Sequence, residues 1–256
     1  MTETASPHPA PVRPGAAGPA ATAGLREAVL NDDQRDIGVP MLLHTAESLH
    51  RSAAAEPLST AAYRHQGALG RRLLEDGALA EPVDLPVLAL NFHAVPAAAR
   101  ARAAERIRRV VRLGWPEVMV AFYDGDRETG LFGAALCAEL GVRAFFFPLL
   151  APAPPPAPVD RLSDDQLAEI ASQHELCFHT ASHRAAAEVT GDTLATEVLE
   201  PFDRLTRLAG RPPRLAAWRG GARFDQASLG DRTLLELGVQ SLVSNWSVEP
   251  LPQAQR

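Results

Sequence analysis

Short apolar runs alternate along the chain with longer segments in which apolar residues recur at helical spacing. Each run is bounded by glycine, proline or polar residues, which is typical of a buried strand. Pro40 weakens the first run as a central strand, because proline has no N–H to donate to a neighbouring strand. The predicted strands are Val39–Leu43, Leu85–Phe92, Val118–Phe122, Val142–Phe147, Glu175–Phe178, Leu215–Trp218 and Val239–Val243.

Helical segments lie between these runs, and several have recognisable ends. Gly114 and Gly141 follow the last apolar positions of two segments, where glycine commonly ends a helix. Ser163 and Gln166 have the spacing of a capping box that begins another helix. Pro201 is expected to kink or split the helix that contains it. The predicted helices are Ser59–Glu75, Ala97–Leu113, Glu128–Leu140, one that starts at Ser163, Thr193–Leu208 and Ala227–Leu237.

Strands that alternate with helices predict an α/β protein with a parallel sheet. The number of strands fits either an open doubly wound sheet or an incomplete (β/α) barrel. In both architectures ligands bind at the carboxyl ends of the strands, so the polar residues there are the candidates for chemistry. They are His44, His93, Tyr123, Asp124, Asp126, His179, His183 and Arg219.

Residues 1–35 are rich in proline, alanine and glycine and lack periodic apolar positions, so we expect a disordered tail there. Residues 36–256 are then long enough for a single domain with one sizeable core. The N-terminus lacks the apolar stretch of a secretory signal, and no run is long enough to span a membrane. We therefore expect a cytoplasmic protein.

Composition narrows the chemistry further. All 25 basic residues are arginine, so chemistry that needs a lysine, such as Schiff-base formation or a P-loop, is excluded. Cys137 and Cys177 are too few for a disulfide framework or a four-thiolate zinc site. The net charge of −6 argues against a general nucleic-acid binder. Histidine, aspartate and arginine remain as the available groups.

His179 and His183 are four residues apart, so in a helix both imidazoles would face one metal ion. With 8 histidines in 256 residues, such a pair arises by chance about a quarter of the time. The spacing alone therefore also fits two hydrogen-bonded histidines at the start of a helix.

The sequence around this pair resembles a motif of a known family. HELCFHTASH, residues 174–183, resembles the second motif of the polysaccharide deacetylases, the NodB-homology group of carbohydrate esterase family 4. VMVAFYDGD resembles the first motif, T-F-D-D-G, and AAWRGGARF resembles the third, which is built on an arginine. The resemblance covers about residues 85–250. It implies a NodB-like fold, an incomplete or distorted (β/α) barrel with about seven parallel strands.

The resemblance also implies a function. The family consists of metal-dependent hydrolases that remove an acetyl or similar acyl group from the nitrogen of an amino sugar or related amide. Asp124, His179 and His183 would hold a divalent metal, with zinc as the expected ion. The substrate would be a small molecule or oligosaccharide that carries an N-acyl group, with no nucleic-acid or membrane partner and an oligomeric state left open.

Two departures from the family's motifs put activity in doubt. Tyr123 stands where the family has its aspartate base, and a phenol with a pKa near ~10 is a poor base at neutral pH. Asp126 is a candidate substitute, and Arg219, which matches the arginine that orients the family's base, would hold Asp126 or a substrate anion. The family's late L-x-H motif supplies a histidine acid, yet no histidine follows His183. Either the domain is truncated or another histidine serves, for which His44 and His93 are the candidates.

Two alternatives therefore stay open beside a deacetylase. One is a catalytically impaired protein that keeps the NodB fold and binds a ligand or partner. The other is a hydrolase on the same scaffold that cleaves a formyl group or a cyclic amide.

Overall fold

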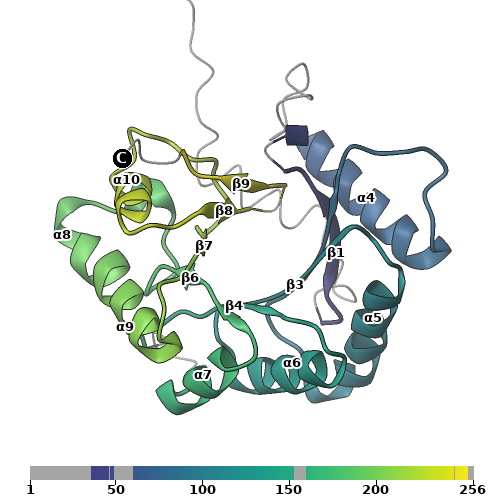
Figure 1. The fold of residues 1–256 in the computed structure, drawn as a ribbon, viewed down its shortest axis with the longest axis horizontal. Helices are drawn as coiled ribbons and strands as arrows, with labels where there is room; N and C mark the ends of the chain where they lie inside the picture. The colour runs from purple at the N-terminus through teal and green to yellow at the C-terminus, as the bar shows by residue number, and fades with distance from the viewer. Residues whose placement is uncertain (1–35, 46, 49–59, 153–159, 245, 253–256) are drawn as a thin grey trace, which may run out of the picture.

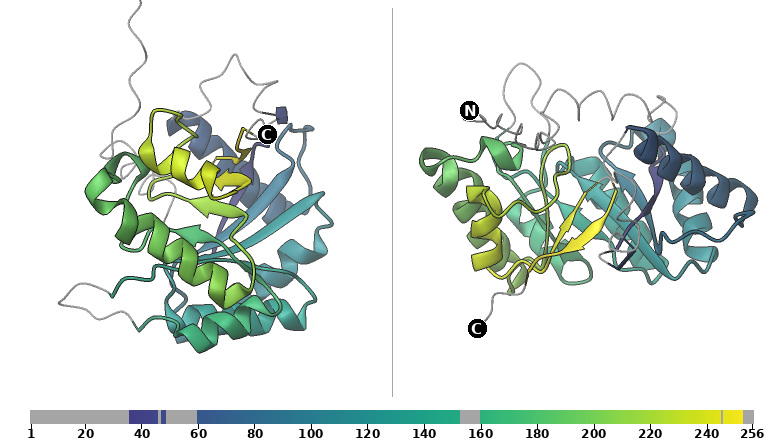
Figure 2. Two further views of the ribbon diagram at one scale, coloured as in Figure 1. Left: turned by 60° about the vertical axis from the view of Figure 1, so that its left-hand side comes forward. Right: turned by 90° about the horizontal axis from the view of Figure 1, so that it is seen from above.

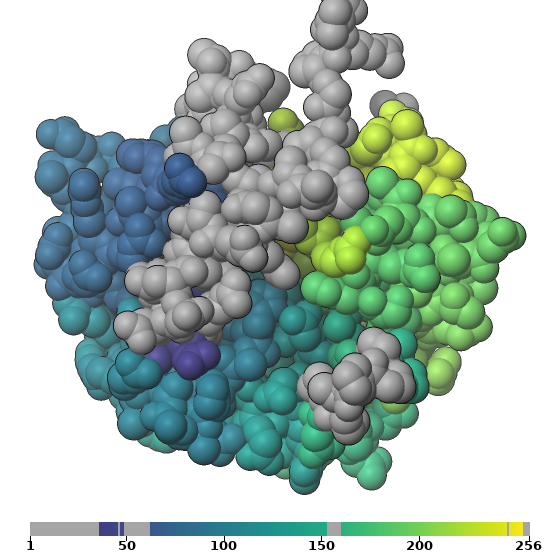
Figure 3. Space-filling view, turned by 180° about the vertical axis from the view of Figure 1, so that it is seen from behind, coloured from purple at the N-terminus to yellow at the C-terminus, as the bar shows by residue number. Residues whose placement is uncertain are grey.

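The computed structural model describes residues 36–45, 47–48, 60–152, 160–244 and 246–252. The strands lie at the centre with helices around them (Figures 1 and 2). The view from behind shows the blue, teal and green segments following one another around the molecule in chain order (Figure 3). The tail expected at residues 1–35 lies outside the described residues. Among those described, no helix is long and apolar enough to cross a membrane.

The strands form two sheets, and within each sheet they are neighbours in chain order. The first contains β1 (Val39–Leu43), β2 (Val87–Phe92), β3 (Glu117–Tyr123), β4 (Phe145–Phe147) and β5 (Glu175–Leu176). The second contains β6 (Phe178–His179), β7 (Leu215–Ala217), β8 (Ser241–Val243) and β9 (Val248–Pro250). Cys177 alone separates β5 from β6, and its N–H donates to the carbonyl of Phe146 at 2.7 Å.

The prediction of about seven parallel strands is wrong in two respects. The described residues contain nine strands, and β9, which is short and ends in a proline, was not predicted. The pairs from β2 to β5 and from β6 to β8 are parallel, but β1 is antiparallel to β2 and β9 is antiparallel to β8.

The chain between β1 and β2 is long enough to allow the antiparallel direction of β1. Helix α4 (Thr60–Asp76) packs on β1, and the segment 77–86 follows before β2 begins. This segment spans up to about 33 Å when extended, enough to bring the chain back along the helix. Antiparallel pairing then places Leu43 opposite Val87, at the amino end of β2. A bridge between His44 and Ser247 connects the end of β1 to the start of β9.

The other helices lie close to their predicted positions. The capping box is confirmed, since the Ser163 hydroxyl accepts from the N–H of Gln166 while the Gln166 side chain accepts from the N–H of Ser163. The helix predicted to be kinked or split near Pro201 is divided just before this residue by a π-helical turn, Ala195–Leu199, between α8 (Gly191–Leu194) and α9 (Glu200–Ala209). The remaining elements are α5 (Arg100–Arg112), α6 (Arg127–Glu139), α7 (Asp164–Ala171), α10 (Leu229–Glu236) and the 3₁₀ turns Ala97–Ala99 and Ala186–Glu188.

Alternate residues of the longer strands β2 and β3 pack into two different apolar clusters. In β3, Val120 and Phe122 join the larger cluster, which includes the helices, whereas Met119 and Ala121 join a smaller cluster on the opposite face. Helix α6 approaches β3 closely, because a Cβ at Gly133 would lie 2.2 Å from Cζ of Phe122. Side chains of a strand alternate between its two faces, so Tyr123, two residues after Ala121, lies on the face of the smaller cluster.

Candidate metal centre and active site

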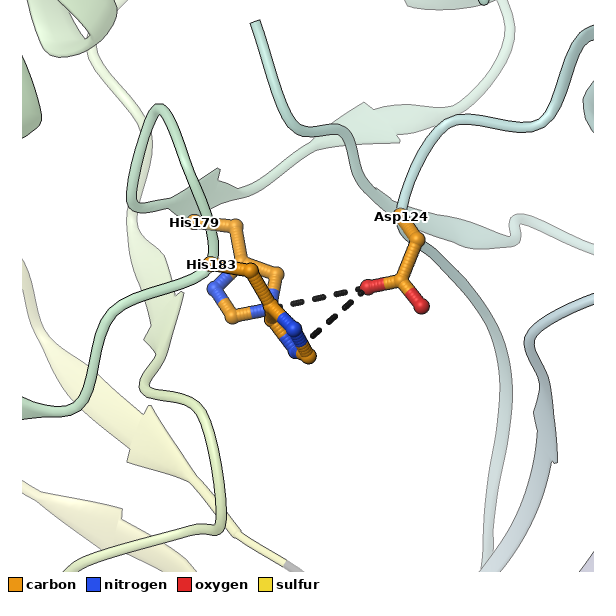
Figure 4. Close-up of side chains that lie close together, drawn as sticks. All are labelled: Asp124, His179 and His183. Atoms are coloured by element: carbon orange, nitrogen blue, oxygen red, sulfur yellow. Dashed lines mark ion pairs between the residues drawn. The ribbon is translucent and has the colours of Figure 1, made fainter. Parts of the chain in front are cut away.

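Asp124, His179 and His183 converge at the carboxyl ends of β3 and β6 (Figure 4). One ligand atom from each residue lies within 4.8 Å of the others. The Asp124 Oδ1 atom is 3.9 Å from Nε2 of His179 and 3.7 Å from Nε2 of His183. The side chain of His179 is only 3% exposed, while those of Asp124 and His183 are 30% and 26% exposed. The group is therefore anchored on one side and open to solvent on the other.

Backbone geometry positions two of the three residues. Asp124 follows β3 with a φ of 68°, and His183 has a φ of 65°. Residues other than glycine rarely adopt this left-handed conformation, and they do so mainly where the surrounding structure holds them. The Asp124 N–H donates to the carbonyl of Phe147 at 3.0 Å, and its own carbonyl accepts from Arg161 at 2.6 Å.

His183 comes to the site through a turn rather than a helix. The sequence allowed for a helix after the fifth predicted strand, but residues 180–184 form a loop. Within this loop the Thr180 hydroxyl accepts from the N–H of Arg184 at 2.6 Å. The loop folds back on β6, and the rings of His179 and His183 meet edge to face with centroids 5.1 Å apart.

Electrostatics favours the metal-binding forms of these side chains. Burial alone would raise the pKa of Asp124, but the hydrogen bond from His93 and the neighbouring imidazoles hold it below its usual range. Burial and the nearby His183 lower the pKa of His179 to about 3. The aspartate is therefore charged and His179 is neutral at physiological pH, as metal ligands must be.

The donor set fits a divalent ion. Two ligand atoms about 2.1 Å from one tetrahedral ion lie about 3.4 Å apart. The Oδ1 atom of Asp124 is 3.7 and 3.9 Å from the two imidazole nitrogens, a few tenths of an ångström more. Oδ2 of Asp124 accepts a hydrogen bond from Nδ1 of His93 at 2.9 Å. Oδ1 is buried and accepts no hydrogen bond from the part of the chain that the structure describes. A buried carboxylate oxygen aimed at two imidazoles is the arrangement expected around zinc.

Tyr123 and His93 lie beside this centre in a row of stacked rings. The Tyr123 ring lies between His93, at a centroid distance of 5.2 Å, and Phe147, at 4.7 Å. The parallel register of β2, β3 and β4 creates the row, since Phe92 pairs with Phe122 and Tyr123 with Phe147. His93 therefore contacts both Tyr123 and the neighbouring Asp124.

Asp126 and Arg219 have other partners. Oδ1 of Asp126 accepts from the N–H of Thr129 at 2.8 Å and caps helix α6. The Arg219 guanidinium pairs with Glu188, whose other carboxylate oxygen accepts from the N–H of Ala185. The structure therefore does not bring these two predicted residues together.

His44 lies at the other edge of the sheet, because β1 is antiparallel to β2. The preceding residue, Leu43, pairs with Val87 at the start of β2, whereas His93 follows the end of β2. Nδ1 of His44 is 3.0 Å from the Ser48 hydroxyl. The expectation that His44 stands at the carboxyl edge with the other candidates is therefore wrong.

Sequence reasoning did not single out three residues that support the site. Arg161 binds the backbone of Asp124, Glu188 pairs with Arg219, and Glu197 accepts hydrogen bonds from the loop that carries His183. Arg161 and Glu188 have no motif that marks them. Glu197 does have a signal, because it stands four residues before Pro201, where a helix has a carbonyl without its usual donor.

Comparison with known proteins places the fold. No family model and no curated protein sequence matches the chain. Among solved structures, IcaB from Ammonifex degensii is similar with a TM-score of 0.52 and 15% identity, over 66% of this chain and 88% of that one. The deacetylase PplD from Streptococcus pyogenes has a TM-score of 0.43 and 15% identity, over 84% and 92% of the two chains. BC0361, a polysaccharide deacetylase from Bacillus cereus, has a TM-score of 0.44 and 14% identity, over 65% and 63%.

This chain has the polysaccharide deacetylase fold. The resemblance predicted from HELCFHTASH and VMVAFYDGD is thus confirmed at the level of the fold. The three residues that converge at the strand ends, Asp124, His179 and His183, belong to the two segments on which the resemblance was predicted.

Proposed function

We propose that this protein is a metal-dependent hydrolase that removes an acetyl or similar acyl group from the nitrogen of an amino sugar or related amide. The observation that carries the proposal is the convergence of Asp124, His179 and His183 at the carboxyl edge of a deacetylase fold. These residues would hold a divalent ion, with zinc as the expected one. When bound, such an ion polarises the amide carbonyl and lowers the pKa of water.

His93 is the residue that we assign to proton transfer. Because the Asp124 carboxylate is ionised, it only accepts, so Nδ1 of His93 donates the 2.9 Å hydrogen bond between them. A carboxylate that binds one nitrogen in this way orients the ring and fixes its tautomer, in which Nε2 is the nitrogen that accepts a proton. His93 would take a proton from the attacking water and return it to the leaving nitrogen. The C–N bond breaks, and acetate and a free amine result.

The environment of Tyr123 supports this assignment. Stacking between His93 and Phe147 uses the faces of the tyrosine ring, and no carboxylate stands at this position to act as base. Asp126 caps a helix through one carboxylate oxygen. Among the candidates for a base, His93 is the one whose ring nitrogen contacts a metal-ligand carboxylate.

The two sheets further support a distorted barrel around this site. The N–H of Cys177, which stands between β5 and β6, donates to the carbonyl of Phe146 in β4, and the His44–Ser247 bridge connects β1 to β9. Strands from both sheets contribute to the smaller apolar cluster. The substrate, a small molecule or oligosaccharide with an N-acyl group, would enter on the side where Asp124 and His183 are exposed.

The proposal is tested by metal binding together with acetate release. Protein prepared with a chelator is titrated with Zn²⁺, and acetate is measured with a panel of N-acetylated amino sugars and their oligomers. We expect one ion per chain, and loss of binding and activity in Asp124→Ala and His179→Ala. His65→Ala, at an exposed position of α4, is the matched control and should change neither property. Absence of zinc binding in the unsubstituted protein would refute the proposal.

A second candidate is a catalytically impaired protein that binds a ligand through the same centre. It is favoured by Tyr123 in the position of the family's base and by the engagement of Arg219 with Glu188. Stoichiometric zinc binding without acetate release from any member of the panel would support it. With N-formylated amino sugars and cyclic amides added as substrates, release of formate or ring opening, with no release of acetate, would instead indicate a hydrolase for another kind of amide.

A further inference from the structure

A buried glutamate of the π-helical turn contacts the loop that carries His183. The Glu197 side chain is 8% exposed and lies among three donors of this loop. Its carboxylate accepts from the Ser182 N–H at 3.0 Å, from the Ser182 hydroxyl at 2.5 Å and from Nε of Arg184 at 2.9 Å. The residues immediately before and after His183 are thus both bound by one carboxylate.

The backbone of Glu197 binds the same loop, and Pro201 explains why it can. In a regular helix the carbonyl of Glu197 would accept from the N–H of residue 201, but proline has none. The carbonyl instead accepts from the N–H of Ala181 at 3.2 Å. The π-helical turn Ala195–Leu199 therefore presents both the side chain and the carbonyl of one residue to the loop. π-Helical turns occur frequently at functional sites.

We propose that Glu197 is a positioning residue for the metal centre, which holds the loop Ala181–Arg184 in the conformation that directs His183 toward Asp124 and His179. The inference deepens the proposed function and rests on it. His183 needs such support because its φ of 65° is a conformation that a histidine does not keep unaided. The contacts on Ala181, Ser182 and Arg184 fix the chain on both sides of that strained residue.

The experiment compares Glu197→Gln with a matched control at the opposite edge of the sheet. Glu175 is also a buried, ion-paired glutamate, since its side chain is 8% exposed and contacts Arg143, Arg211 and Arg214. Glutamine keeps the shape of either side chain but removes its charge. Zinc affinity is measured by competition with a chromophoric chelator, and thermal stability is measured for both variants.

We expect Glu197→Gln to weaken zinc binding by about 10–100-fold, as loss of groups that orient metal ligands does. Glu175→Gln should lower the melting temperature but leave zinc affinity within about twofold. An unchanged zinc affinity in Glu197→Gln, or an equal loss in both variants, would overturn the inference.

A readout in the metal-free protein separates this inference from the proposed function. Hydrogen exchange of the Ala181 and Ser182 amides reports whether the loop is held, because both amides donate to Glu197. We expect faster exchange of Ser182 in Glu197→Gln, and unaltered exchange in Glu175→Gln. If the unsubstituted protein binds no zinc, the proposed function and the role of Glu197 at the metal centre both fail. If the Ala181 and Ser182 amides are nevertheless protected from exchange by Glu197, this residue has only a structural role in holding the loop.

Pro201→Ala provides a second variant that does not remove the carboxylate. The added N–H competes with Ala181 for the carbonyl of Glu197 and favours a regular α-helix. We expect faster exchange of the Ala181 amide and a weaker affinity for zinc, in a helix that is otherwise intact. Unchanged exchange and affinity in this variant would contradict the role assigned to the backbone of Glu197.

Discussion

The guanidinium of Arg161 donates a hydrogen bond of 2.6 Å to the backbone carbonyl of Asp124, across 37 residues of chain. The same nitrogen is 3.3 Å from the carbonyl of Leu149. Arg161 thus joins the segment after β3 to the segment after β4. Because Asp124 has a left-handed backbone, this contact stabilises the conformation that points its carboxylate at His179 and His183.

Arg161→Ala is therefore expected to weaken zinc binding by about tenfold or more, since Asp124 would lose a contact that fixes its backbone. Arg161→Lys should retain part of the affinity, because an ammonium can still donate to one carbonyl. Isothermal titration with Zn²⁺ measures both. Arg223→Ala, which removes an exposed arginine paired with Glu249, should leave the affinity unchanged. Equal affinities in all three variants would show that Arg161 does not support the site.

His93→Asn is expected to lower kcat by about 10²–10⁴-fold, the usual contribution of a positioned acid–base group. Tyr123→Phe keeps the stacked ring and should change kcat by less than about threefold, because the phenol is not assigned to proton transfer. Steady-state acetate release from the best substrate of the panel measures both variants, with zinc content checked in each. A large loss in Tyr123→Phe with full zinc content would assign the proton transfer to the tyrosine.

His174 predicts a pH-dependent stability. Burial lowers its pKa below the usual value, and its ring joins the carbonyl of Ala134 to the N–H of Ala144. The His174 imidazole therefore binds its proton at a higher pH in the unfolded chain than in the folded chain. The contribution of His174 to stability is complete above a pH of about 6.5 and is lost as the pH falls below it. Urea unfolding should show that the difference in free energy of unfolding between the unsubstituted protein and His174→Gln becomes smaller as the pH falls from about 8 to about 5. A difference that does not vary with pH would refute this account.

Gly133→Ala should destabilise the protein by about 1–3 kcal/mol, because the added Cβ overlaps the ring of Phe122 and pushes α6 away from β3. Gly191→Ala is the matched control, since a Cβ there meets no atom within 4 Å. Its effect should stay within about 0.5 kcal/mol. Chemical unfolding of the two variants distinguishes close packing from a general effect of replacing glycine.

Much of the fold could be predicted because local signals were strong. Ser163 and Gln166 marked a helix start by side chains that bond neighbouring backbone, and the apolar runs marked the strands. The direction of β1 could not be predicted, because the chain between β1 and β2 is long enough for either direction. β9 was missed because Val248–Pro250 is too short to show alternation.

The metal-ligand candidates were identified by motif, whereas their surroundings depend on contacts between distant segments. Asp124 and His183 lie close together as the motifs predicted, but their left-handed backbone conformations could not be predicted from the sequence. Asp126 was a candidate base by proximity in sequence, although its position before α6 also fits a helix cap, and the structure places it there. Arg161 approaches Asp124 only through tertiary folding.

The π-helical turn also sets the rotational phase between α8 and α9. Each residue of an α-helix adds about 100° of rotation, and a π turn holds roughly one residue more than an α turn over the same length. Removing one residue from Ala195–Leu199 would turn α8 relative to α9 by about 100° and carry the side chain of Glu197 away from Ser182. The arrangement of His183 therefore depends on the number of residues in a helix as well as on their identity.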